Sequence, residues 1–222
     1  MNPNVRHLVA GKLAWQERLS STDESRGFRG WHERGYLPHL DRPGVRQMVN
    51  FRLADALPRE LRHEWEDIFS LSDDRRRFAR LEAYCDRGHG ACELWQSEIA
   101  ARFEEILLHD HGRRCGVLAW VVMPNHVHLL VEVWDTPLGK LVQSWKKMGT
   151  DFRNARLGLR GQWWQEDYFD RLIRDEAHFQ RAVRYIEENP VKAGLVKAPR
   201  EWPWGSARWR PDGLGLQPWH KP

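Results

Sequence analysis

The 222-residue sequence contains no apolar run of membrane-spanning length, and its mean hydropathy is −0.71. A bilayer core needs about 20 consecutive apolar residues, so we expect a soluble protein with no membrane partner. The first twenty residues also lack a basic stretch followed by an apolar one. Exported chains carry that pattern, so we expect this protein to stay in the cytoplasm.

Cysteine is scarce: the chain has only Cys85, Cys92 and Cys115, and no pair of them shows the CxxC spacing. The odd number argues against a disulfide framework, and the spacing does not resemble a zinc knuckle. We interpret the three residues as ordinary buried or half-buried thiols in a reducing compartment.

No single sign of charge dominates the chain, whose net charge is +4. Residues 1–136 hold 19 Lys and Arg against 21 Asp and Glu, whereas residues 137–222 hold 16 against 10. A basic half suggests a surface that meets a polyanion, most simply nucleic acid. The thirteen tryptophans offer flat rings for base stacking, although we expect most of them in the core.

Hydrophobic periodicity predicts an α+β chain. Strands are predicted at 45–54, 115–123, 126–134 and 168–173, and helices after Pro58, Asp73 or Asp74, Ser97, Thr136 and Asp175. The link between residues 123 and 126 is so short that these strands must form an antiparallel hairpin. The strand at 115–123 is apolar on both faces, which predicts a central place in the sheet. We therefore expect an antiparallel β-sheet with helices packed on its faces.

The remaining segments divide the chain into a main domain and two ends. Residues 1–28 are polar and broken, so we interpret them as a flexible N-terminal extension. Residues 29–206 form the domain, and 207–222 a C-terminal tail. Within the domain, residues 29–39 mix aromatic and basic side chains with Gly35 and Pro38, which predicts a loop that can touch a ligand.

The stretch 117–134, VLAWVVMPNHVHLLVEVW, carries two histidines on one strand. Alternate side chains of a strand share a face, so His126 and His128 stand side by side while Val127 points to the other, apolar face. An imidazole pair in this position is well placed to hold a metal ion. The alternative is that both histidines are polar residues on a solvated face.

A third ligand and a nucleophile are available in YIEENPVKAGLV, which starts at Tyr185. Tyr185 and Asn189 share a helix face if the helix continues that far. A phenol oxygen can attack phosphorus, and a metal held by two imidazoles and an amide keeps open positions. However, Pro190 should limit the helix and disfavours helical geometry at Asn189. A capping role for Asn189 and simple packing of Tyr185 therefore remain alternatives.

Three segments, MPNHVHLLVE, WWQEDYFDRLIRDEAHFQRAVRYIEENPVKAGLV and EWPWGSA, resemble the REP-associated tyrosine transposases. These are single-tyrosine members of the HUH (His-hydrophobic-His) endonuclease class. GYLPH, NFRLAD and DRGHGAC extend the resemblance over most of residues 28–206. The resemblance implies an HUH nuclease core in which His126, His128 and Asn189 bind Mg or Mn and Tyr185 is the nucleophile. Tyr168 is a rival nucleophile.

The resemblance also implies a substrate and a cellular setting. It suggests a bacterial, nucleoid-associated enzyme that cuts and joins single-stranded DNA at palindromic REP hairpins through a covalent 5′-phosphotyrosine. The alternatives are a domesticated protein that binds hairpin DNA without cutting it, and a metal hydrolase that uses water. The sequence leaves the oligomeric state open between monomer and homodimer.

The candidate DNA contacts lie in two parts of the chain. In the segment of about residues 29–40, we expect help in reading a short tetranucleotide beside the hairpin. In the basic half, cationic side chains on and after the helix at 138 suit phosphate contacts, the alternative being a solvated face. The candidates are Arg34, Tyr36, Lys140, Lys146, Lys147, Arg153 and Arg171.

Overall fold

A four-stranded antiparallel sheet forms the centre of the computed structural model, which describes residues 18–34, 37–71 and 74–210. The strand order is β4-β5-β3-β6. The strands are β3 (Arg46–Arg52), β4 (Cys115–Val122), β5 (His126–Val133) and β6 (Phe169–Leu172). Both neighbours of β5 are antiparallel to it. The predicted α+β class with an antiparallel sheet is confirmed.

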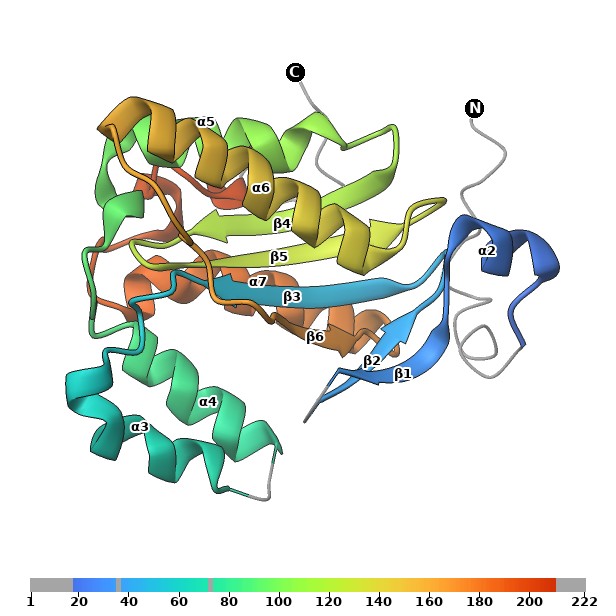
Figure 1. The fold of residues 1–222 in the computed structure, drawn as a ribbon, viewed down its shortest axis with the longest axis horizontal. Helices are drawn as coiled ribbons and strands as arrows, with labels where there is room; N and C mark the ends of the chain where they lie inside the picture. Colours follow the sequence, from blue (N-terminus) through green and yellow to red (C-terminus); the bar gives the residue numbers. More distant parts are fainter. Residues whose placement is uncertain (1–17, 35–36, 72–73, 211–222) are drawn as a thin grey trace.

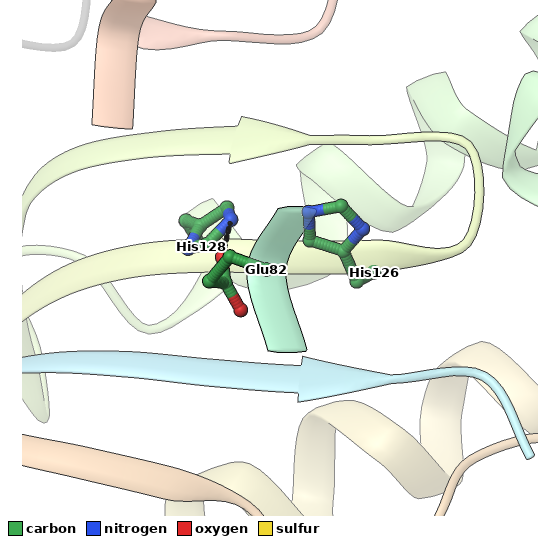
Figure 2. A group of neighbouring side chains, drawn as sticks. All are labelled: Glu82, His126 and His128. Carbon is green, nitrogen blue, oxygen red and sulfur yellow. Dashed lines mark ion pairs between the residues drawn. The ribbon is translucent and has the colours of Figure 1, made fainter. Parts of the chain in front are cut away.

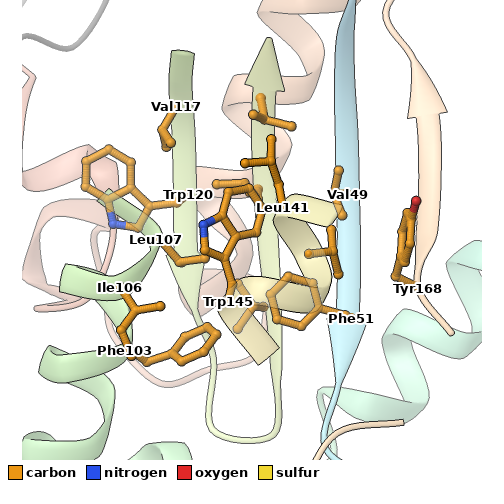
Figure 3. Packing of buried hydrophobic residues seen from close by; sticks show 14 of the residues in the cluster. Val49, Phe51, Phe103, Ile106, Leu107, Val117, Trp120, Leu141, Trp145 and Tyr168 are labelled. Atoms are coloured by element: carbon orange, nitrogen blue, oxygen red, sulfur yellow. The ribbon is translucent and has the colours of Figure 1, made fainter. Parts of the chain in front are cut away.

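Helices cover both faces of this sheet (Figure 1). Helices α5 (Ser97–His109) and α6 (Leu138–Leu157) lie on one face, and α7 (Glu176–Lys192) lies on the other. On the first face the apolar side of β5 packs against large aromatic residues, among them Phe103, Trp120 and Trp145 (Figure 3). On the second face, Leu130 of β5 packs in a smaller cluster with Val183 and Ile186 of α7. The histidine side of β5 therefore faces the α7 layer.

Strand β4 lies at the edge of the sheet, so its predicted central place is wrong. The segment after α7 covers this edge. The Val122 amide donates to the Trp204 carbonyl at 2.9 Å, and the Trp120 amide donates to Ser206 Oγ at 3.2 Å. This segment includes the short 3-10 helices η4 (Pro199–Glu201) and η5 (Ser206–Trp209). Within the described chain no further named strand pairs with β4. Its two apolar faces are nevertheless buried, because helices and the segment after α7 cover it.

Residues 30–34 and 37–41 form a second, two-stranded sheet, so the predicted loop is wrong. Strand β1 (Gly30–Arg34) pairs antiparallel with β2 (Leu37–Asp41), and the short helix α2 (Ser21–Arg26) precedes them. Residues 1–17 and 211–222 lie outside the described part of the chain. The expected extension is thus described only from residue 18, and the expected tail only up to residue 210.

A helical hairpin is inserted between β3 and α5. It consists of η2 (Arg59–Leu61), α3 (Arg62–Phe69) and α4 (Asp74–Cys85), and η3 (Glu93–Trp95) leads on to α5. The hairpin has a small apolar cluster of its own, built from Ile68, Leu81 and Tyr84. Its two ends are tied together where the Ala91 amide donates to Asp55 Oδ2 at 2.7 Å. At the neighbouring Gly90, an added Cβ would lie 2.6 Å from the Asp55 carbonyl oxygen, so this close approach requires glycine.

Helix α7 continues through Pro190 to Lys192, so the expectation that Pro190 limits the helix is wrong. The helix begins as predicted at Asp175, whose Oδ1 accepts a hydrogen bond from the His178 amide at 2.7 Å. Pro190 has no N–H to donate to the Ile186 carbonyl, which costs the helix one hydrogen bond in its last turns. Because the helix persists, Tyr185 and Asn189 lie one turn apart on the same face.

Among the described residues, no helix is long and apolar enough to cross a membrane. All three cysteines are free; Cys85 and Cys115 are buried and Cys92 is half-buried, as predicted.

Candidate metal and tyrosine site

Strand β5 places His126 and His128 on one side, with their ring centroids 4.8 Å apart. Both side chains are almost fully buried, at 1% and 0% exposed. A solvated strand face is therefore not the reason for this pair. Across the sheet, β3 sets Asn50 opposite His128 and Arg52 opposite His126. The pair thus lies at the interior of the molecule, where polar atoms need partners.

The ring of His126 is oriented by its neighbour in sequence. Its Nδ1 lies 2.8 Å from Asn125 Oδ1, whereas its Nε2 has no hydrogen-bond partner. Burial, followed by the proximity of His128, lowers the pKa of His126 to about 3. The ring is therefore neutral near pH 7, with a proton on Nδ1 donated to Asn125 and a lone pair on Nε2. This is the tautomer that a metal-binding histidine needs.

Glu82 of α4 reaches the histidines from the inserted hairpin, a contact that sequence reasoning missed (Figure 2). Its Oε2 lies 2.7 Å from His128 Nε2, and its Oε1 accepts a hydrogen bond from Asn50 Nδ2 at 2.9 Å. Burial alone would raise the pKa of Glu82, but attraction to His128 lowers it to about 2. The carboxyl group is therefore ionised. Ligand atoms of Glu82, His126 and His128 all lie within 4.8 Å of one another.

Tyr185 of α7 meets the same carboxylate. Its hydroxyl donates to Glu82 Oε2 at 3.2 Å, and its ring stands edge-on to His128 with centroids 5.6 Å apart. Burial, followed by the negative charge of Glu82, raises the pKa of the phenol above its ordinary value. The hydroxyl is therefore protonated near neutral pH, and a nearby positive charge would be needed to favour the phenolate.

Asn189 completes the set of predicted ligands. It is 2% exposed, and its Nδ2 lies 3.2 Å from His128 Nε2 while its Oδ1 has no hydrogen-bond partner. An amide can present either end, because its oxygen and nitrogen are distinguished only through their hydrogen bonds. The structure thus brings His126, His128, Tyr185 and Asn189 together, from two segments far apart in sequence.

The residues at this site fit a divalent cation. Carboxylate and amide oxygens are ligand atoms that bind Mg²⁺ and Mn²⁺, and imidazole nitrogens bind first-row transition metals. Two buried acceptor atoms, His126 Nε2 and Asn189 Oδ1, have no hydrogen-bond partner. Such atoms are costly unless something binds them. A cation at this position would satisfy them.

The segment that holds most of this site is similar to known proteins. The family described as "Transposase IS200 like" matches residues 92–189, which include both histidines, Tyr185 and Asn189. A REP-associated tyrosine transposase from Escherichia coli (strain K12) is 34% identical over 115 residues, covering 51% of this chain and 66% of the relative. Over this segment the chain is therefore similar to a REP-associated tyrosine transposase. A protein of Haemophilus influenzae is 26% identical over 106 residues, covering 40% of this chain and 57% of that relative. The matches thus span less than two thirds of either relative.

A solved structure supports the same fold. It is a REP-associated tyrosine transposase bound to a REP hairpin, and it aligns with a TM-score of 0.50 at 20% identity. The alignment covers 84% of this chain and 87% of that chain. The antiparallel sheet with helices on both faces is therefore a fold that this chain shares with that structure.

Tyr168, the rival nucleophile, lies away from the two histidines. It immediately precedes β6, is 7% exposed, and its ring lies against His39 with centroids 5.2 Å apart. It also lines a groove of about 690 Å³ between α6 and residues 162–168. That groove opens on the α6 side of the sheet, whereas the histidines face the α7 side.

Three of the predicted DNA contacts line this groove: Lys140, Lys146 and Lys147. Lys146 fixes one wall, since its Nζ donates to three backbone carbonyls of residues 165–167 at 2.8 to 3.1 Å. Lys147 is exposed and pairs with Asp151 at 2.6 Å. The groove therefore combines cationic side chains with aromatic ones, among them Trp163 and Trp164.

The other candidate contacts lie elsewhere. Arg153 makes a two-pronged ion pair with Glu93, with both distances at 2.7 Å, and both side chains are largely buried. Arg171 is half-buried on β6. Neither lines the groove. Arg34 ends β1, but its side chain lies outside the described part of the chain, as does all of Tyr36.

Proposed function

We propose that the protein is a metal-dependent single-stranded DNA endonuclease and strand transferase that acts on palindromic REP-type hairpins, with Tyr185 as its nucleophile. The observation that carries this proposal is that a phenol and a buried imidazole pair meet at one carboxylate. Glu82 Oε2 lies 3.2 Å from the Tyr185 hydroxyl and 2.7 Å from His128 Nε2. A nucleophile beside a candidate metal site is the arrangement that phosphodiester transfer requires.

His126, His128 and Asn189 would hold Mg²⁺ or Mn²⁺. When bound, the cation neutralises charge on a non-bridging phosphate oxygen and orients the scissile bond. The protein prepares the site in advance. Asn125 fixes the tautomer of His126, and β3 and β5 hold both rings at a set spacing. Such preorganisation lowers the cost of reaching the transition state.

The proposed step is a transesterification. The Tyr185 oxygen forms a bond to phosphorus, and the bond from phosphorus to the 3′ oxygen breaks. The phenol gives up its proton, and the released 3′ oxygen gains one, leaving a 5′-phosphotyrosine and a free 3′-hydroxyl. Glu82 Oε2 accepts the hydrogen bond of the phenol and so orients it before attack. Reversal on another strand rejoins DNA without an external energy source.

The DNA partner is inferred from relatives and from charge. The relative of known structure was solved with a REP hairpin, and three lysines converge on the groove beside α6. We propose that Lys140, Lys146 and Lys147 contact DNA phosphates there, with further contacts from Arg34, Tyr36 and Arg171. Such a partner would place the protein at the bacterial nucleoid.

A covalent-adduct gel tests the proposed reaction. The protein is incubated with Mn²⁺ and a hairpin oligonucleotide carrying a short single-stranded flank, labelled at either its 3′ or its 5′ end. We expect the 3′ label to migrate with the denatured protein and the 5′ label to migrate as a shorter free fragment. EDTA should abolish both products, because the phenol is protonated without a cation nearby.

Other results would point to other functions. Cleavage without an adduct would indicate a metal hydrolase that uses water. Retarded migration of the hairpin on a native gel with neither product would indicate a DNA-binding protein without cleavage. An oligonucleotide of the same composition without the palindrome serves as the control for hairpin recognition.

Lys147 and Arg153 should respond differently to replacement by alanine. Lys147→Ala removes an exposed charge from the groove, so we expect weaker binding of single-stranded DNA. The slope of log K against the logarithm of the salt concentration should also become smaller in magnitude by about 0.7. Arg153→Ala leaves Glu93 largely buried without its partner, so we expect a loss of about 3 kcal/mol of unfolding free energy. Fluorescence anisotropy at several salt concentrations and urea unfolding measure the two quantities. Equal effects on both quantities in both variants would contradict this division of roles.

A further inference from the structure

The C-terminal end of helix α4 presents two carboxylates to the two histidines: Glu82 lies in the last turn, and Asp86 directly follows the helix. The Asp86 amide donates to the Glu82 carbonyl at 2.9 Å, so the backbone keeps the helical turn and both side chains lie on the same side of it. Glu82 Oε2 lies 2.7 Å from His128 Nε2, and Asp86 Oδ1 lies 3.7 Å from His126 Nε2. The spacing of the carboxylates at the end of α4 thus matches the spacing of the imidazoles on β5.

The facing atoms of Asp86 and His126 have no hydrogen-bond partners. His126 is 1% exposed, and its other nitrogen already contacts Asn125 Oδ1, which requires a proton on Nδ1. In the neutral ring Nε2 is then a lone pair, and the carboxylate opposite it is also an acceptor. Two buried acceptors that face each other are unfavourable unless a positive charge lies between them.

The end of α4 is held at this position by the same residue that orients His126. Asn125 Nδ2 donates to the carbonyl of Cys85 at 3.1 Å and to that of His89 at 3.0 Å. Asn125 therefore joins the last turn of α4 to the turn before β5 while its Oδ1 contacts His126. The buried apolar residues of the helical hairpin form a small cluster of their own, and α4 meets the body of the protein through polar contacts such as those of Asn125, Asn50 and Tyr185.

We propose that α4 is part of the metal centre, and that Glu82 and Asp86 are carboxylate ligands of the divalent cation held by His126 and His128. This inference rests on the metal site of the proposed function. An imidazole must be neutral to bind a metal, so two carboxylates and two imidazoles acting as ligands would together carry a charge of −2, which balances a divalent cation in a buried site. Cation binding should then also fix the α3–α4 hairpin against the sheet.

Mn²⁺ binding to the metal-stripped full-length protein tests this ligand set. Isothermal titration with Mn²⁺ alone is performed on wild type, Glu82→Gln, Asp86→Asn and His128→Ala. Asp67→Asn, which removes an exposed carboxylate of the same hairpin, is the matched control. We expect Glu82→Gln and Asp86→Asn each to weaken Mn²⁺ binding about tenfold or more. His128→Ala should bind at least as poorly, and Asp67→Asn should bind like wild type.

Hydrogen exchange gives a second readout that is independent of activity. In wild type, Mn²⁺ should slow exchange of the α4 amides, and Asp86→Asn should lose most of that protection. Among the described residues, the Asp86 carboxylate forms an ion pair only with His126, so its amide variant should fold even if Glu82→Gln does not.

The outcomes separate this inference from the proposed function. Wild-type affinity in both carboxylate variants, with binding lost in His128→Ala, would overturn the role of α4 and leave the histidine site intact. Wild-type affinity in His128→Ala as well, or no Mn²⁺ binding by wild type, would overturn the metal site itself and this inference with it. Weakened binding in the two carboxylate variants and His128→Ala, but not in Asp67→Asn, would support both.

Discussion

Replacing Tyr185 with phenylalanine should lower the rate of covalent adduct formation by at least about a thousandfold. The substitution keeps the ring against His128 and removes only the oxygen that would bond to phosphorus. Binding of the hairpin should persist, since the ring and every basic side chain remain. Single-turnover assays with a 3′-labelled hairpin measure the rate, and native gels measure binding.

Tyr168→Phe is the matched control, because Tyr168 is the rival nucleophile and is also largely buried. Tyr168 lines the groove beside α6 and not the histidine site, so we expect adduct formation within about threefold of wild type, as for substitutions away from reacting groups. An adduct that survives in Tyr185→Phe and disappears in Tyr168→Phe would transfer the nucleophilic role to Tyr168. Thermal unfolding of each variant shows whether a loss of adduct formation is caused by a loss of folding.

The parts of this site that sequence could predict are those set by local periodicity. A strand's two-residue period places His126 and His128 together, and a helix's four-residue spacing places Tyr185 and Asn189 together. The resemblance to a known family then predicted that the histidine pair and the Tyr185–Asn189 pair belong to one site. The one local rule that misled was the effect of Pro190, because tertiary packing of α7 outweighs the loss of one backbone hydrogen bond.

The contribution of α4 could not be read in the same way. Glu82 lies in an arginine-rich helix whose carboxylates look solvated in sequence, and only docking of the hairpin buries it to 3% exposed. The available signal was the pair Glu82 and Asp86 at helical spacing beside apolar residues, and that pattern is common on surfaces. Similarly, the apolar faces of β4 do not reveal that a segment from the C-terminal end, and not another strand, covers its edge.

Replacing Trp145 with alanine should remove about 4 kcal/mol of unfolding free energy, a large part of the 5–15 kcal/mol typical of a domain. The side chain is 0% exposed in the main core between α6 and the sheet, and its Nε1 donates to Asp110 Oδ2 at 3.1 Å. The variant would lose packing and leave a buried carboxylate with one fewer donor. Urea unfolding followed by circular dichroism measures the loss.

Trp31→Ala should leave the unfolding free energy almost unchanged, in contrast to Trp145→Ala, because Trp31 lies on the surface and Trp145 lies in the core. Trp31 is 55% exposed on β1, so its removal should change the unfolding free energy by less than about 0.5 kcal/mol. If the β1–β2 hairpin reads single-stranded bases by stacking, the same variant should bind a single-stranded flank about tenfold more weakly. Fluorescence anisotropy with DNA hairpins that carry or lack the single-stranded flank separates stacking of Trp31 on the flank from binding of the DNA hairpin itself. Unchanged affinity for the flanked hairpin would mean that the exposed ring does not stack on DNA, and the reading of the flank would then have to come from other residues.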